Sequence, residues 1–355
     1  MEMLGASVYL SQENEDIIKY LEKMQKYGVK TIFTSMHIIE DDNDEAVDRI
    51  KMVSQKINSL KMELMVDISD NTMKKFNMTF DEIIKFFEYI NVKSLRIDFG
   101  FNFDQIKKLS EHFNIVLNAS TINDDYCNKL ISAGMDLHDI TACHNFYPRV
   151  ETGLSEKFLL EKNKYLKEKG FKIQAFIPGD EIKRGPLEEG LPTLEKHRHS
   201  APLISYIELK KDFMVDEVLI GDISIKEESL KPILLYEKDK LIELHVENLL
   251  DLTDAISEVF WITHKNRLDY SEYVIRSTMP RVQIKEKVKA ENTIERKVGS
   301  ITIDNEKYLR YNGEIQIALK ELNADERVNV LGKVVDEDIP LLKYIIDEVK
   351  FRFVK

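Results

Sequence analysis

The sequence predicts an α/β protein, with a (β/α)8 barrel over residues 1–238 and a small β-rich domain over residues 239–355. Short β-branched or apolar runs alternate with amphipathic helical stretches, which is typical of repeated βα units. Eight such runs fit within about 225 residues, the size of a closed barrel, whereas a doubly wound sheet usually has fewer strands. Near residue 240 this alternation stops, and the total of 355 residues favours a second domain.

The barrel elements follow one another in order. The predicted strands are residues 4–10, 30–36, 61–69, 92–100, 114–120, 139–145, 171–179 and 215–223. The predicted helices are residues 14–27, 43–60, 79–90, 102–112, 123–133 and 155–169. No G-x-G-x-x-G motif follows the first strand, which argues against a dinucleotide-binding sheet.

The second domain has few long helical stretches. The segments LIELHVENL, FWITH, TIERKVGSITID and GEIQIAL predict strands of an antiparallel β domain. Asn312-Gly313, between YLRY and EIQIAL, predicts the tight turn of a hairpin. Near the end, IPLLKYIIDEV predicts one packed helix.

Composition and charge exclude several classes of protein. The net charge of −12 argues against nucleic acid as a partner, because that binding depends on basic surfaces. The first residues have no basic region, and no later stretch approaches the ~20 apolar residues of a membrane span. With only Cys127 and Cys143, the sequence predicts a cytoplasmic protein without a membrane partner. No pattern in the sequence predicts an oligomeric state.

The ends of the predicted strands are polar, and in a barrel of this kind catalytic groups lie at those ends. The residues there are Asp67, Ser69, Arg96, Asp98, Asn118, Ser120, His144, Asn145, Asp180, Glu181 and Asp222. Side chains alternate with period two, so Arg96 and Asp98 share one face of their strand. Each residue alone could be a helix cap, since Asp and Ser are favoured there. Six strands that end alike favour a polar layer at the barrel mouth.

Asp67 and Asp98 end neighbouring strands, whose backbones lie ~4.8 Å apart. Two carboxyl groups there fit a glycosidase pair, at either the ~5–5.5 Å of retaining enzymes or the ~6.5–9.5 Å of inverting ones. In the alternative interpretation, Asp98 is a fixed carboxylate paired with Arg96.

Two loops supply further candidate ligands for a small polar molecule with an apolar face, such as a sugar. After strand 6 comes His144-Asn145-Phe146-Tyr147-Pro148-Arg149, which could also be a proline turn over a packed aromatic ring. The long loop after strand 7 contains Arg184, Glu195 and Arg198. Arg149, Arg184 and Arg198 are candidate phosphate ligands, unless they are ordinary solvated arginines.

Metal and cofactor chemistry receive little support. His197 and His199 lie two residues apart with no H-E-x-x-H motif or calcium loop, so no metal is predicted. Lysines lie at the starts of strands, away from the catalytic end, which argues against a Schiff base. The sequence therefore predicts no cofactor.

Several segments resemble the bacterial 6-phospho-N-acetylmuramidase family, a barrel family with a C-terminal cyclophilin-like domain. They are SVYL, FTSMHI, DIS, LRIDFGF, LNAST, HNFYPR, TGLS and RGPLEEGLPTLEKHR. The similarity spans the barrel, whereas the second domain is similar only in position and β character. The chain departs from the family pattern after FTSMHI, where Ile39 and Glu40 stand in place of an expected proline.

The resemblance implies intracellular cleavage of 6-phospho-N-acetylmuramic acid from N-acetylglucosamine during cell-wall recycling, with a phosphorylated amino-sugar disaccharide as substrate. For such a site we expect Asp67 and Asp98 to be catalytic and Arg149, Arg184 and Arg198 to bind phosphate. The expected sugar ligands are Glu40, Arg96, Asn118, His144, Asn145, Tyr147, Asp180, Glu195 and Asp222. The alternatives are a non-catalytic phosphosugar-binding module and a sugar-phosphate isomerase or epimerase.

Overall fold

A computed structural model describes residues 4–36 and 46–355 of the chain. The chain divides between Leu230 and Lys231 into two compact units. Within the described residues, no helix has both the length and the apolar character needed to cross a membrane.

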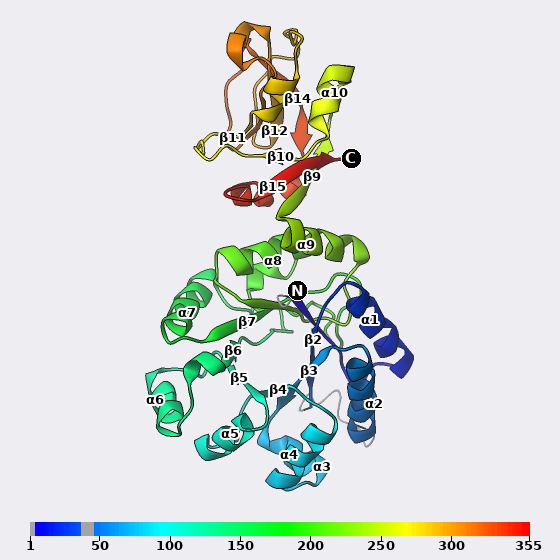
Figure 1. Ribbon diagram of the computed structural model, residues 1–355, viewed down its shortest axis with the longest axis vertical. Helices are drawn as coiled ribbons and strands as arrows, with labels where there is room; N and C mark the ends of the chain where they lie inside the picture. The colour runs from blue at the N-terminus through cyan, green and yellow to red at the C-terminus, as the bar shows by residue number, and fades with distance from the viewer. Residues whose placement is uncertain (1–3, 37–45) are drawn as a thin grey trace. The chain divides into compact units, whose positions relative to one another are not determined.

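The first unit is a closed parallel barrel in which each strand pairs with the next and β8 pairs with β1, confirming the predicted (β/α)8 fold. Its strands are β1 Leu4–Ser7, β2 Thr31–Ser35, β3 Glu63–Ile68, β4 Ser94–Ile97, β5 Asn114–Asn118, β6 Thr141–Cys143, β7 Lys172–Ile177 and β8 Glu217–Ile220. Figure 1 shows helices arranged around the outside of these strands. The helices are α1 Asn14–Lys26, α2 Ala46–Ser59, α3 Asp70–Phe76, α4 Phe80–Tyr89, α5 Phe103–Ser110, α6 Asp124–Ser132, α7 Glu156–Glu168 and α8 Pro202–Lys211. Helix α9 Glu227–Asp239 begins in the first unit and ends in the second.

The outer helices begin and end where local chemistry dictates. Thr79 and Glu82 form a reciprocal capping box at the start of α4, and Asn102 and Gln105 do the same at the start of α5. Each box satisfies backbone N–H groups that have no partner within the helix. These caps define where α4 and α5 begin.

The barrel interior is filled by a ring of apolar side chains, one from each of several strands. Its members are Phe33, Met65, Val116, Cys143, Phe176 and Leu219, with Phe146 packed against them. Gly5 on β1 leaves room for this ring, because a Cβ there would lie 2.2 Å from the Leu219 side chain. This ring closes the interior at its own level, so a ligand that enters from the mouth would be held by groups nearer the strand ends.

The second unit contains a seven-stranded sheet with strand order β10-β15-β9-β14-β12-β13-β11. Its strands are β9 Leu241–Glu247, β10 His264–Lys265, β11 Val274–Ser277, β12 Ser300–Asp304, β13 Ile315–Ala318, β14 Val328–Val334 and β15 Lys350–Val354. Its α-helices are α10 Asp254–Phe260 and α11 Met279–Gln283. The expectation of a purely antiparallel sheet is wrong, because β15 pairs with β9 in parallel.

Two local predictions for this unit are also wrong. YLRY lies in 3-10 structure (Glu306–Tyr311) that Asn305 caps, so Asn312-Gly313 does not join two strands directly. Gly313 instead supplies a positive φ of 88° on the way into β13. The predicted final helix is 3-10 structure over Asp336–Tyr344, and Pro340 inside it disfavours an α-helix.

Candidate active site

The centre of the barrel mouth is a buried ion pair between β3 and β4. Asp67 and Arg96 are direct neighbours in the strand register, and Arg96 Nη1 donates to Asp67 Oδ1 at 2.7 Å. Ser35 Oγ, at the end of β2, donates to the other carboxylate oxygen at 3.0 Å. Burial lowers the pKa of Arg96, but Asp67, Cys143 and Asp98 together outweigh burial, and the net pKa is raised. The guanidinium is therefore a permanent positive charge at the rim.

Asp98 lies beside this pair and is more accessible. Its Oδ1 is 3.7 Å from Arg96 Nη1, and its side chain is 22% exposed against 6% for Asp67. Asn118, at the end of β5, donates from Nδ2 to Asp98 Oδ1 at 2.8 Å, while the Asn118 Oδ1 accepts from Ser120. Consecutive strands thus place two carboxylates, a guanidinium and an amide in one connected network.

The loop after β6 joins this network through Asn145. Arg96 Nη2 donates to the Asn145 side-chain oxygen, and Thr193 donates to the Asn145 carbonyl. Tyr147 is partly buried close by, and burial raises the pKa of its phenol. Asn145 and Tyr147 therefore lie with Asp67, Arg96 and Asp98 on the same rim, as the strand-end rule predicts.

Arg184, from the loop after β7, lies over aromatic rings at the barrel mouth. Its guanidinium carbon is 4.7 Å from the Tyr9 ring centroid and 6.0 Å from that of Phe146. Phe146 in turn packs on the apolar ring inside the barrel. Arg184 is only 8% exposed, so this loop brings a positive charge and apolar ring faces together above the core.

Arg198 and Glu195 fasten the loops together and leave no donor of Arg198 for a ligand. The Arg198 Nε and Nη2 groups donate to the Glu195 carboxylate, each at 2.7 Å. The remaining N–H groups donate to the carbonyls of Glu189, Gly190, Tyr147 and Arg149. A guanidinium has five N–H groups, so the expectation that Arg198 binds phosphate does not fit this geometry.

Glu195 likewise has a structural environment. Beyond Arg198, its carboxylate accepts from the backbone N–H groups of Glu151 and Gly153 at 2.9 and 2.7 Å. The Arg198 hydrogen bonds are the main reason that the pKa of Glu195 is lowered to about 2. Glu195 therefore connects the loops after β6 and β7 and has little capacity left for a sugar hydroxyl.

Asp222 and Asp180 also organise backbone. Asp222 is fully buried and accepts from the N–H groups of Gly179, Arg184 and Leu191. Asp180 accepts from the Lys226 N–H and the Ser229 hydroxyl at the start of α9. Both carboxylates thus hold the loops around Arg184 in place, a role that differs from the sugar contact expected of them.

His144 points away from the rim network. Its ring is 1% exposed, and its Nε2 lies 2.6 Å from the Asn163 Oδ1 on α7. Asn163 in turn donates to the Phe213 carbonyl. Burial lowers the pKa of His144 to about 4, so the ring is neutral and joins β6 to the surrounding helix.

The last two predicted residues are Arg149 and Glu40. Arg149 is exposed beside the loop after β6, while Glu40 lies outside the described residues. Sequence reasoning missed Ser35 and Tyr9, which contact Asp67 and Arg184. Ser35 ends β2, so the strand-end rule applied to that strand would have found it.

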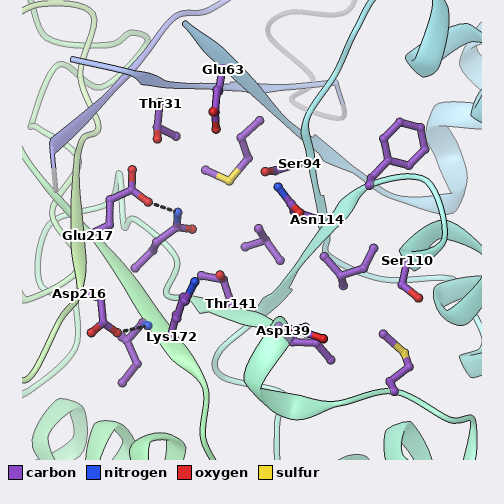
Figure 2. Close-up of a pocket in the computed structure, with 18 of the residues that line it drawn as sticks. Thr31, Glu63, Ser94, Ser110, Asn114, Asp139, Thr141, Lys172, Asp216 and Glu217 are labelled. Atoms are coloured by element: carbon purple, nitrogen blue, oxygen red, sulfur yellow. Dashed lines mark hydrogen bonds between the residues drawn. The ribbon is translucent and has the colours of Figure 1, made fainter. Parts of the chain in front are cut away.

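A separate cavity of about 880 Å³ opens at the other end of the barrel. Figure 2 shows Thr31, Glu63, Ser94 and Glu217 around it, and these residues lie near the starts of their strands. Gln174 donates to Glu217 there, and burial raises the pKa of Glu217. This cavity contains none of the strand-end groups, so we place the candidate active site at the opposite rim.

Known proteins share both units of this chain. Residues 4–234 match the model described as 6-phospho-N-acetylmuramidase, N-terminal, and residues 242–354 match its C-terminal counterpart. A conserved protein of unknown function from Enterococcus faecalis is 38% identical, with a TM-score of 0.88 over 99% of this chain and 96% of that chain. An uncharacterized B. cereus protein is 26% identical, with a TM-score of 0.82 and complete coverage of both chains. No curated protein matches. The chain belongs to the 6-phospho-N-acetylmuramidase family.

Proposed function

We propose that this protein is a cytoplasmic glycosidase that separates 6-phospho-N-acetylmuramic acid from N-acetylglucosamine in cell-wall recycling. The observation that carries the proposal is the network of Asp67, Arg96, Asp98 and Asn118 at the ends of β3, β4 and β5. Family membership supplies the reaction, and carboxylates at the barrel mouth are the groups that glycoside hydrolysis uses.

Within the carboxylate pair, we assign the contact with the glycosidic oxygen to Asp98. Asp98 is the more exposed of the two, whereas Asp67 accepts hydrogen bonds from both Arg96 and Ser35. That arrangement suits a fixed carboxylate better than a proton donor. Asp67 would then be the nucleophile, and Asp98 the acid that contacts the glycosidic oxygen.

The spacing of the pair argues against the acid and base of an inverting enzyme. Asp67 Oδ1 and Asp98 Oδ1 contact the same Arg96 nitrogen at 2.7 and 3.7 Å. Their separation therefore cannot exceed the sum of these distances, about 6.4 Å. Inverting enzymes hold their carboxyl groups ~6.5–9.5 Å apart to admit a water, and retaining enzymes ~5–5.5 Å apart. We propose a retaining reaction in which Asp67 attacks the anomeric carbon while Asp98 protonates the departing glycosidic oxygen, after which Asp98 takes a proton from the water that cleaves the glycosyl–Asp67 ester.

We further propose that Arg184 binds the anionic part of the substrate, with Arg149 nearby at the rim. Arg184 combines a nearly buried guanidinium with the ring faces of Tyr9 and Phe146. Such a surface suits a sugar ring that carries a phosphate or carboxylate. Asn118, Asn145 and Tyr147 are the neutral polar groups left to orient hydroxyl and acetamido groups.

The phosphorylated disaccharide, incubated with the protein in deuterated water, distinguishes the three function classes. A glycosidase releases N-acetylglucosamine and 6-phospho-N-acetylmuramic acid, which mass spectrometry resolves. An isomerase or epimerase exchanges carbon-bound hydrogen for deuterium and leaves the glycosidic bond intact. A binding module does neither, although calorimetry would register the disaccharide. Only release of the two sugars supports the proposal, and either other result overturns it.

A further inference from the structure

The second unit contains a concentration of arginines that the proposed reaction does not use. The arginine cluster consists of Arg267, Arg276, Arg281 and Arg310, which surround Glu314 and Tyr311. Arg276 Nε and Arg281 Nη1 donate to the two oxygens of the Glu314 carboxylate at 2.8 and 2.9 Å. Glu314 is fully buried. Such a group of arginines is notable in a chain whose net charge is −12.

Aromatic and backbone contacts hold the rest of the cluster together. The guanidiniums of Arg281 and Arg310 lie 5.4 and 5.0 Å from the Tyr311 ring centroid. The Arg267 N–H donates to the Arg276 carbonyl, which places these two segments side by side. Arg267 has one acidic partner, Asp269, at 2.7 Å. Four arginines thus gather near two paired carboxylates, Glu314 and Asp269.

The pairing of strands β11, β13 and β12 shows which face of the sheet carries Arg276. Arg276 on β11 lies opposite Gln316 on β13, and Gln316 lies opposite Thr302 on β12. Directly opposed residues project from the same face of a sheet, so these three polar side chains form a row. Gln316 also donates to Glu314, which brings an amide to the same place as the two guanidiniums.

Arg276 and Arg281 retain donors after binding Glu314. Among residues 4–36 and 46–355, the Nη groups of Arg276 and the Nε and Nη2 groups of Arg281 have no hydrogen-bond acceptor. Their side chains are 23% and 27% exposed. This differs from Arg198, whose five N–H groups are all used by the protein. The free donors here are therefore available to an anion from solution.

Asp304 lies two residues after Thr302 on β12, so its side chain is on the same face of the sheet as that row of polar side chains. Asp304 is 3% exposed, and its Oδ1 has no hydrogen-bond partner in the described part of the chain. Its backbone N–H donates to the Glu314 carbonyl. Burial is the main reason that the pKa of Asp304 is raised to about 7. The nearby carboxylates Glu314 and Asp325 add to this rise, whereas Arg276 and Arg296 oppose it. Near neutral pH this carboxyl group holds a proton for much of the time and can donate it in a hydrogen bond.

We propose that Arg276 and Arg281, with Gln316 and Asp304, form a binding site for a phosphate monoester in the second unit. A phosphate carries about −1.5 to −2 charges and three acceptor oxygens, which match several convergent donors better than the two oxygens of a carboxylate do. Guanidinium groups bind such oxyanions in pairs of parallel hydrogen bonds. The argument for this site rests on residues of the second unit alone.

Calorimetric titration of the full chain with inorganic phosphate and with glucose 6-phosphate tests this site. The double variant Arg276→Gln/Arg281→Gln should weaken one phosphate-binding event by on the order of tenfold or more. The matched control is Arg352→Gln in the same unit, where Arg352 pairs with Glu243, and it should bind as wild type does. Phosphate binding that the double variant leaves unchanged, or its absence in wild type, overturns the proposal. Equal binding of acetate at this site overturns the assignment to phosphate.

Asp304→Asn provides a second test that preserves side-chain size. At pH 8 the wild-type carboxyl group is mostly ionised and repels phosphate, whereas an amide does not. The variant should therefore bind phosphate more tightly than wild type at pH 8, and the difference should shrink at pH 6. Identical affinities of the two proteins at both pH values would contradict a role for Asp304 in the site.

Discussion

Replacing Arg96 by methionine is the sharpest test of how the barrel mouth is held together. Arg96 and Asp67 have side chains only 5% and 6% exposed and share a 2.7 Å hydrogen bond. Methionine fills much of the same space but leaves the Asp67 carboxylate without its buried partner. Breaking one side of a buried ion pair costs about 3–5 kcal/mol. For a unit of this size, about 1 kcal/mol shifts Tm by roughly 2–4 °C, so we expect a fall of about 10 °C.

Differential scanning calorimetry of the full chain measures this change, because it follows heat absorption by each unit. The matched control is Arg327→Met, which removes an arginine whose exposed side chain pairs with Asp325. Exposed ion pairs add little to stability, so the control should melt close to wild type. If Arg96→Met is no more destabilising than Arg327→Met, the Asp67–Arg96 pair does not hold the mouth together and our reasoning is wrong.

Two further predictions concern groups around the rim. The folded-state pKa of His144 is about 4, below the ~6.5 of an unfolded chain, so protons favour the unfolded state as pH falls. Stability should decline by about 3 kcal/mol between pH 6.5 and 4, and urea unfolding of His144→Gln should show a smaller decline; equal declines would contradict this. Arg198→Gln should free the loops after β6 and β7, and limited proteolysis should cut residues 181–198 faster than in Arg149→Gln. Matching cleavage rates in the two variants would show that Arg198 does not fasten the loops.

The periodicity of the sequence was sufficient to predict the barrel and part of its rim. Period-two alternation and strand order place Asp67, Arg96, Asp98 and Asn118 together, and the structure joins them through hydrogen bonds. These relationships follow from neighbouring strands, whose geometry is regular. The alternative that Asp98 pairs with Arg96 also fits, since the two lie 3.7 Å apart.

The roles of the loop residues could not be predicted from the sequence, because they depend on the conformation of the folded loops. Arg198 is attractive as a phosphate ligand because of its charge, but its donors are taken by carbonyls whose positions depend on the loop conformation. Asp222 is similar, since three backbone N–H groups converge on it only after the loop has folded. His144 follows β6 as expected, yet its ring binds Asn163, a contact between elements that periodicity does not specify.

The turnover of the phosphorylated disaccharide by Asp98→Asn tests the central claim most directly. Losing a positioned carboxylate removes on the order of 10²–10⁴-fold in rate, and the amide keeps the shape that Asn118 contacts. Asp104→Asn, which changes an exposed aspartate on α5, is the matched control. We predict that mass spectrometry will detect rapid sugar release by wild type and Asp104→Asn and almost none by a folded Asp98→Asn protein. Release by Asp98→Asn within tenfold of the wild-type rate would contradict a catalytic role for Asp98.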